Sequence, residues 1–169
     1  FHARPSSEDK TKPNASCDGC HDTHGFNVPA KNTPQYDQWR LGISESCGAK
    51  CHEDQLESYS GSVHGMAVME KKDVKAAVCT DCHSTHSITS SSDDPFKLAV
   101  TDQCGSCHKD SLKTYVSTYH GQISTLGYAY TAKCYDCHGS HKIVKVSDPK
   151  SRVHPNNVLK TCQSCHSGK

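Results

Sequence analysis

The chain has 169 residues, of which only 33% are hydrophobic and 7% are aromatic, and its 19 basic residues nearly balance its 18 acidic residues. A side-chain core of ordinary size is excluded, because so polar a chain cannot bury enough apolar surface to offset the entropy of ordering it. The charge balance resembles no nucleic-acid-binding footprint, and no stretch approaches the roughly 18 apolar residues of a membrane span.

The 12 cysteines form six pairs, and a histidine follows each pair directly. In chain order the motifs are Cys17/Cys20/His21, Cys47/Cys51/His52, Cys79/Cys82/His83, Cys104/Cys107/His108, Cys134/Cys137/His138 and Cys162/Cys165/His166. Five have the C-x-x-C-H spacing typical of c-type haem attachment, in which two thioether bonds hold the porphyrin and the histidine binds the iron. The second pair has one extra intervening residue, and we expect Gly48 to let this longer loop bulge. The pattern predicts six c-type haems.

Three other interpretations of the cysteine pairs explain less. Zinc ribbons use cysteine pairs but do not require a histidine directly after each second cysteine. A disulfide framework explains the even count but not the histidines. Redox-active C-x-x-C pairs are typical of an α/β pattern, which this sequence lacks.

Further histidines recur around the odd-numbered motifs. One group lies three residues after a motif histidine: His24, His86 and His141. Another precedes the odd motifs by 15, 15 and 14 residues: His2, His64 and His120. These six, with the six motif histidines, supply two axial ligands for each of six irons. Only His154 is surplus, and we interpret it as a surface or hydrogen-bonded residue.

The histidine pattern divides the chain into three two-haem repeats, approximately 1–61, 62–117 and 118–169. Each contains a lone histidine, then C-x-x-C-H-x-x-H, then a second Cys/Cys/His motif. The lone histidine has the context Ser-Val-His-Gly at 62–65 and Thr-Tyr-His-Gly at 118–121. Because the period is too short for separate cores, we expect one domain spanning 1–169.

Short helices are predicted between the even motifs and the lone histidines. His52, Leu56, Tyr59 and Val63 recur as His108, Leu112, Tyr115 and Tyr119. Their spacing predicts one face of a helix that packs against a haem. Prolines and Ser/Asp runs indicate loops elsewhere. The predicted fold is mostly irregular coil with short α-helices wrapped around a stacked haem chain, and little or no β-structure.

Two stretches carry a family resemblance. The segments 79–86 and 134–141, followed by Asp148-Pro149, resemble multihaem cytochromes c related to cytochrome c3 and to small electron carriers of nitrite reduction. The beginning, Phe1-His2 and 17–24, resembles hexahaem outer-surface cytochromes of metal-reducing bacteria, which polymerise into conductive filaments. In that family the second histidine of the first motif ligates a haem of the neighbouring subunit, which implies this role for His24.

These patterns predict electron transfer rather than catalysis. Two histidines per iron leave no open site, and no motif ends in the lysine by which multihaem nitrite reductases often supply one. We expect a location outside the cytoplasm, extracellular or at the cell surface, with redox proteins or extracellular acceptors as partners. The alternatives are a soluble periplasmic shuttle and a reductase with one open haem site.

The histidine order also predicts head-to-tail assembly into a homopolymer. If His86 reaches back to the second haem and His141 to the fourth, the same rule sends His24 to a haem of an adjacent subunit. A contact of this heterologous kind that does not close gives a helical fibre. The alternative is a monomer in which His24, His86 and His141 each ligate the second haem of their own repeat.

Overall fold

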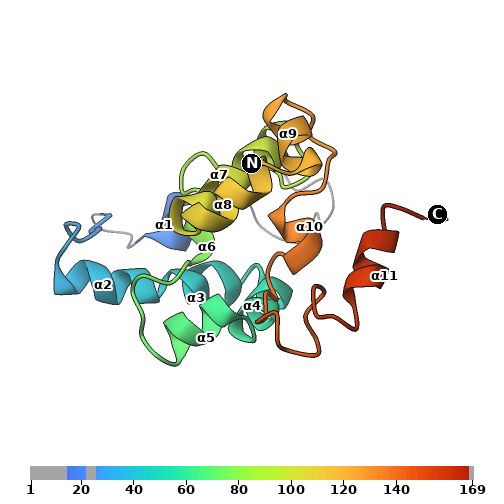
Figure 1. Ribbon diagram of the computed structural model, residues 1–169. Helices are drawn as coiled ribbons and strands as arrows, with labels where there is room; N and C mark the ends of the chain where they lie inside the picture. The colour runs from blue at the N-terminus through green and yellow to red at the C-terminus, as the bar shows by residue number, and fades with distance from the viewer. Residues whose placement is uncertain (1–14, 22–25, 168–169) are drawn as a thin grey trace. The chain divides into compact units, whose positions relative to one another are not determined.

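The computed structural model describes residues 15–21 and 26–167 (Figure 1). About half of these residues are helical, and none of them lies in a β-strand. The helices are short, since even the longest, α7 (Asp94–Cys107), has 14 residues. The predicted fold class of short helices and coil with little or no β-structure is therefore confirmed, whereas haem stacking and the three repeats stay predictions.

The chain divides into two compact units, Phe1–Ile88 and Thr89–Lys169. The first contains α1 (Cys17–Cys20), α2 (Pro34–Leu41), α3 (Ile43–Gly48), α4 (Glu53–Ser60), α5 (Val63–Met69) and α6 (Cys79–His83). The second contains α7, α8 (Lys109–Val116), α9 (Tyr119–Thr125), α10 (Cys134–His138) and α11 (Val158–Gln163). No helix in the described residues is long and apolar enough to cross a membrane. The boundary between the units lies inside the predicted second repeat.

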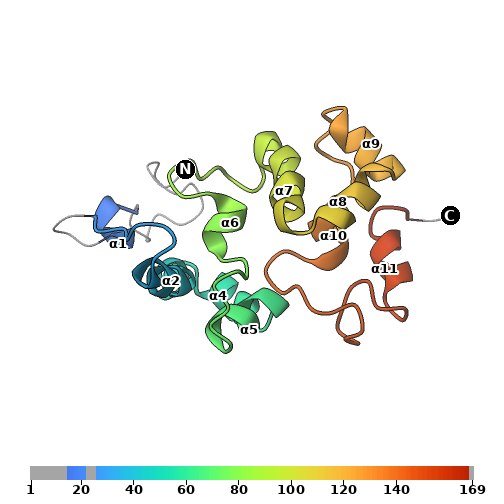
Figure 2. The ribbon, with the colours of Figure 1, turned by 60° about the vertical axis from the view of Figure 1, so that its left-hand side comes forward.

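Helices α3 to α6 of the first unit have counterparts in α7 to α10 of the second. Within the second unit, α7 and α8 lie side by side in both views (Figures 1 and 2). The hydroxyl of Tyr59 donates to the carbonyl of Ala77 at 2.8 Å, and the hydroxyl of Tyr115 donates to the carbonyl of Ala132 at the same distance. In each unit a tyrosine, Tyr59 of α4 or Tyr115 of α8, therefore holds the loop before an odd-numbered motif.

The predicted helical stripe is divided between two helices. Leu56 and Tyr59 lie in α4, whereas Val63 is the first residue of α5. The chain breaks between them because the Ser62 hydroxyl accepts a hydrogen bond from the Gly65 N–H at 2.9 Å and caps a new helix. The prediction of one continuous stripe was wrong, and the second unit repeats the break between α8 and α9.

The side-chain core is small. Among the described residues the buried hydrophobic side chains are Ile43, Tyr59, Val68, Val78, Val100 and Ala129. Large apolar side chains remain exposed in the second unit, including Tyr119 at 84% and Leu126 at 88% exposure. This distribution agrees with the expectation that a polar chain of this composition needs apolar surface from something other than its own side chains.

Candidate functional site

The cysteine motifs occupy two kinds of local structure. The odd-numbered motifs form short helices of their own, α1, α6 and α10. The even-numbered motifs begin near the ends of helices that start earlier, α3, α7 and α11, of which α7 extends through both cysteines. In a helical turn, residues three apart lie on one face, so a C-x-x-C pair presents both thiols to the same side. This is the arrangement that two thioether bonds to one porphyrin require.

The third motif shows this arrangement within a single helix. Cys79 is the first residue of α6 and Cys82 is its fourth, so both side chains leave the same face of one helical turn. Both residues are half-buried, in contrast to Cys17 and Cys20 of the first motif, which are exposed. Helix α6 thus places Cys82 where the second thioether bond of this motif would form, and the attachment itself stays a prediction.

The attachment cysteines differ in exposure along the chain, a difference that their common spacing did not indicate. The half-buried cysteines are Cys47, Cys79, Cys82, Cys104, Cys134 and Cys137, and the exposed ones are Cys17, Cys20, Cys51, Cys107, Cys162 and Cys165. Both cysteines are exposed in the first and last motifs, whereas both are half-buried in the third and fifth. The polypeptide therefore encloses the third and fifth attachment points more closely than those of the first and last motifs.

The second motif differs from the fourth in where its helix ends. Helix α7 continues through both cysteines of the fourth motif, whereas α3 ends at Gly48 and Cys51 lies in the following turn. Gly48 does not form the predicted bulge, because it remains helical and packs closely against α4. A Cβ at Gly48 would lie 2.3 Å from the Leu56 side chain, and one at Gly105 would lie 2.3 Å from Leu112. The turn after Gly48 accommodates the extra residue instead.

Attachment points of consecutive motifs meet within each unit. A hydrogen bond between Cys47 and Cys79 lowers the pKa of the Cys79 thiol to about 7 and raises the pKa of Cys47. In the second unit a hydrogen bond to Cys104 lowers the pKa of the Cys134 thiol to about 7. The first cysteine of an even motif is thus adjacent to the first cysteine of the following odd motif in both units.

An aspartate inside the third and fifth motifs holds the start of the attachment helix. An Asp81 carboxylate oxygen accepts a hydrogen bond from the Val78 N–H at 2.7 Å, and Asp136 accepts one from the Lys133 N–H at 2.7 Å. A carboxylate in the first helical turn is also favoured by the helix dipole. Neither residue was predicted from the sequence, although aspartate precedes the second cysteine in both motifs.

In the first unit, Arg40 of α2 holds the loop that leads into the third motif. Its Nε donates to the Val74 carbonyl at 2.8 Å, and its Nη2 donates to the Ala76 carbonyl at 3.1 Å. The same guanidinium forms a bidentate ion pair with Asp81 at 2.7 and 3.2 Å. Arg40 therefore links α2, the loop and the attachment helix.

In the second unit, Lys133 binds loop carbonyls that correspond to those bound by Arg40 in the first. Its ammonium donates to the carbonyls of Tyr128, Ala129 and Thr131 at 3.3, 3.3 and 3.0 Å. Ala129 and Thr131 occupy the positions of Val74 and Ala76, counted back from the first cysteine of the motif. Lys133 is only 1% exposed, and burial lowers its pKa.

We predict that Lys133→Met destabilises the haem-loaded protein by about 1–3 kcal/mol, because three carbonyls lose their donor in a buried site. Chemical denaturation followed by the haem absorbance would measure the loss. Lys150→Met, which changes an exposed lysine of the same unit, is the control and should leave the midpoint unchanged. A Lys133→Met midpoint equal to the control would contradict the assigned role.

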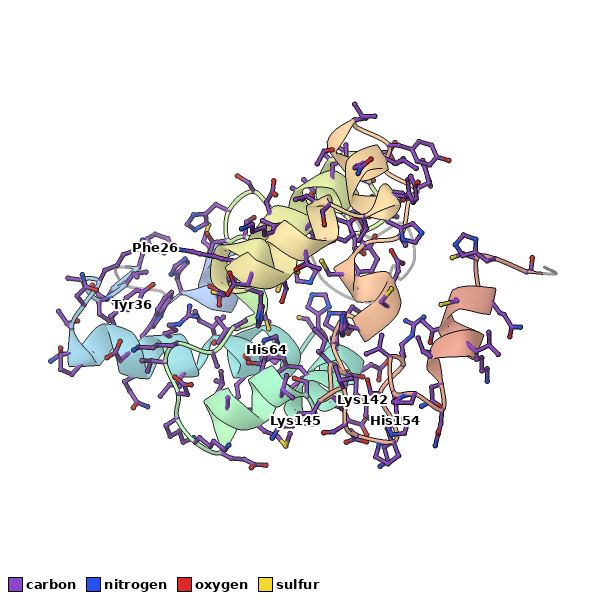
Figure 3. The ribbon with its side chains drawn as sticks, viewed as in Figure 1. Phe26, Tyr36, His64, Lys142, Lys145 and His154 are labelled. Atoms are coloured by element: carbon purple, nitrogen blue, oxygen red, sulfur yellow. The ribbon has the colours of Figure 1, made fainter. Side chains whose placement is uncertain are left out.

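The predicted iron ligands are distributed over both units. His64 lies on α5 and His154 on the loop before α11 (Figure 3). The Nδ1 atom of His154 accepts a hydrogen bond from the Asn156 N–H at 3.2 Å. That His154 is not an iron ligand stays a prediction. His2 and His24 lie outside the described residues.

Among the ring contacts of the described residues, two bring a motif histidine close to a histidine outside the motifs. The rings of His21 and His86 have centroids 6.0 Å apart, and those of His120 and His166 are 5.9 Å apart. The residues that could bind a haem are thus the thiol pairs on one helical face, the motif histidine next to each pair, and imidazoles from outside the motifs that lie near a motif histidine. These residues fit c-type haem: the paired cysteines would hold the porphyrin, and the histidines would bind the iron.

Comparison with known proteins supports the same chemistry. Residues 71–113, which contain the third and fourth motifs, match the family model described as doubled CXXCH motif. The match supports a multihaem c-type cytochrome with covalently bound haem and a role in electron transfer. It covers one short stretch of the chain. No curated protein and no solved structure matches the chain significantly.

Proposed function

We propose that this protein transfers electrons through six covalently bound c-type haems, each with two histidine ligands. The observation that carries the proposal is the meeting of attachment points, Cys47 with Cys79 and Cys104 with Cys134, which would bring haems of consecutive motifs together. Bound haem supplies an iron that changes between the ferric and ferrous states. Short distances between such groups favour electron transfer without rearrangement of the protein.

The residues of this chain would set the properties of the haems. Two imidazoles fill both axial positions of an iron and so exclude water and substrate from it. Relative to His/Met ligation, they favour lower reduction potentials. We therefore propose an electron carrier and not an enzyme. The competing function, a reductase with one open haem site, would give a high-spin ferric signal of one haem's intensity.

We predict that the purified protein carries six haems, because each of the 12 cysteines belongs to a pair followed by histidine. Intact mass measurement would count them, and the ultraviolet-visible spectrum should show only low-spin haem. A Cys47→Ala/Cys51→Ala variant is the reference for five haems. Five haems in the unmodified protein, with free thiols at Cys47 and Cys51, would show that the longer motif is not loaded.

We further propose that the protein acts outside the cytoplasm as a subunit of an extracellular conductive filament, or nanowire. Its redox partners would be proteins or extracellular electron acceptors. Support comes from the resemblance of the first motif to filament-forming hexahaem cytochromes and from the supply of one distal histidine for every motif. In this assembly, His24 of one subunit ligates a haem of its neighbour. The alternative function is a soluble periplasmic electron shuttle.

We predict that His24→Ala prevents filament assembly and makes one haem high-spin, because the neighbouring subunit then lacks an axial ligand. Electron microscopy and electron paramagnetic resonance would measure the two effects. His154→Ala, which removes the surplus histidine, should retain filaments and low-spin haems. An unmodified protein that stays monomeric with six low-spin haems would favour the periplasmic shuttle.

A further inference from the structure

Two ring pairs in the structure each join a motif histidine to a histidine outside the motifs, which we call a spare histidine. His21 and His86 have centroids 6.0 Å apart and an interplanar angle of 29°. His120 and His166 have centroids 5.9 Å apart and an angle of 42°. Each pair lies within one compact unit, and its members are far apart in sequence. Local helical geometry therefore does not impose either pair.

The separation matches that of two imidazoles on opposite sides of one metal ion. A bond between a metal and an imidazole nitrogen is about 2 Å long. The centre of the imidazole ring lies about 1.1 Å from its nitrogen, as ring bonds of about 1.33 Å require. Two rings on one metal axis therefore have centroids roughly 6 Å apart. Both observed pairs have this spacing.

Simple ring stacking explains the two pairs less well. Aromatic rings also pair with centroids about 4.5–7 Å apart, a range that includes both pairs. His86, His120 and His166 are all exposed, whereas His21 is half-buried and its ring also contacts that of Phe26, with centroids 5.4 Å apart. Each pair also combines one ring from an attachment motif with one from outside the motifs. Ligation of one iron by both rings would explain why mostly exposed rings lie close together and why each pair joins a motif histidine to one outside the motifs.

The backbone changes conformation between the third attachment helix and His86. Ser84 has a φ of 60°, and Gly139, at the same place after the fifth motif, has a φ of 85°. In both motifs the residue with positive φ directly follows the attachment helix, which ends there. For serine this conformation is unfavourable, whereas glycine adopts it freely. His86 lies two residues beyond this change in backbone conformation.

We propose that His86 is the distal ligand of the haem on Cys17 and Cys20, and that His120 is the distal ligand of the haem on Cys162 and Cys165. This assignment rests on the proposed function, because it requires that both motifs carry haem. It replaces the ligation of the second haem by His86 that the order of motifs suggested, so the role of His24 in a filament rests on the family resemblance and not on that order. The haem of the sixth motif also gains a distal ligand, so its iron has no open coordination position.

The test is to locate the haem that each spare histidine protects. In the haem-loaded protein, His86→Ala and His120→Ala should each convert one of six haems from low-spin to high-spin. Mild peroxide should then degrade the haem with the open position, while haems with two ligands resist. Mass mapping of haem peptides should show loss of the haem on Cys17/Cys20 for His86→Ala and of the haem on Cys162/Cys165 for His120→Ala.

A second measurement does not depend on peroxide chemistry. In a Cys17→Ala/Cys20→Ala protein, adding His86→Met should change neither the spin state nor the potential of any remaining haem, whereas adding His120→Met should change one haem. In a Cys162→Ala/Cys165→Ala protein the two outcomes should exchange. Because methionine still offers a ligand, these variants disturb the site less than alanine does.

The outcomes separate the ligand assignment from the proposed function. Loss of a haem from any other motif, or six low-spin haems in both alanine variants, overturns the assignment. A change of one haem by His86→Met in the Cys17→Ala/Cys20→Ala protein overturns it as well. A purified wild-type protein without haem instead refutes the proposed function. His154→Ala serves as the control and should retain six low-spin haems.

Discussion

Removal of the haems is expected to unfold the chain. Fewer than ten of the described hydrophobic side chains are buried, and each contributes about 1.5–3 kcal/mol when fully buried. Ordering the backbone costs about 1–2 kcal/mol for every residue. With so few buried side chains, the apolar surface that balances this cost must come largely from the porphyrins.

Far-ultraviolet circular dichroism of a haem-free protein would measure this effect. Replacement of the 12 cysteines by serine gives a chain that cannot attach haem. Its spectrum should lack the helical signal of the haem-loaded protein and should show no cooperative thermal transition. A native-like spectrum with cooperative melting would refute the dependence on haem. The haem-loaded protein with His154→Ala controls for a change in surface composition.

The attachment motifs and the helical class could be predicted because both depend on local patterns. Two cysteines and a histidine at fixed spacing define the chemistry, and scattered prolines and serines limit helix length. The division of the helical stripe could also have been predicted, since Ser62 and Thr118 are good N-cap residues. Their capping hydroxyls accept hydrogen bonds from Gly65 at 2.9 Å and Gly121 at 3.1 Å.

The residues that hold the motif loops could not be predicted in the same way. Arg40 reaches Val74 and Asp81, which lie 34 and 41 residues away, so no local spacing relates them. The role of Lys133 could not be predicted for a different reason. Lysine is almost never fully buried, and a sequence gives no sign of such burial. Contacts distant in sequence determine the role of Arg40, whereas Lys133 binds carbonyls only two to five residues before it. The two units therefore hold the same loop with different cations.

The glycines after the lone histidines have a steric role that the structure reveals. A Cβ at Gly65 would lie 1.9 Å from the Tyr59 carbonyl oxygen, and one at Gly121 would lie 2.1 Å from the Tyr115 carbonyl oxygen. These are backbone atoms that cannot rotate away. The Tyr59 carbonyl is further held by a 2.9 Å hydrogen bond from the Ser62 N–H. Glycine is therefore needed for α5 to approach α4 and for α9 to approach α8.

The shared Ser/Thr-x-His-Gly context now has a physical explanation. The hydroxyl caps the helix, the glycine permits close approach to the preceding helix, and the histidine lies between them. In the second unit this arrangement positions His120, whose ring is 5.9 Å from His166. The pattern thus combines a structural device with the placement of an imidazole.

We predict that Gly65→Ala and Gly121→Ala each destabilise the haem-loaded protein by about 3 kcal/mol or more, because overpacking against backbone forces two helices apart. Denaturant titration with absorbance detection would measure the change. Gly61→Ala is the matched control: its Cβ would have no neighbour nearer than the Ser58 carbonyl oxygen at 3.9 Å. Since Gly61 has a φ of −83°, alanine fits there, and we expect stability to stay the same or rise by up to about 1 kcal/mol. Equal midpoints for Gly65→Ala, Gly121→Ala and Gly61→Ala would show that the close approach of these helices does not contribute to stability.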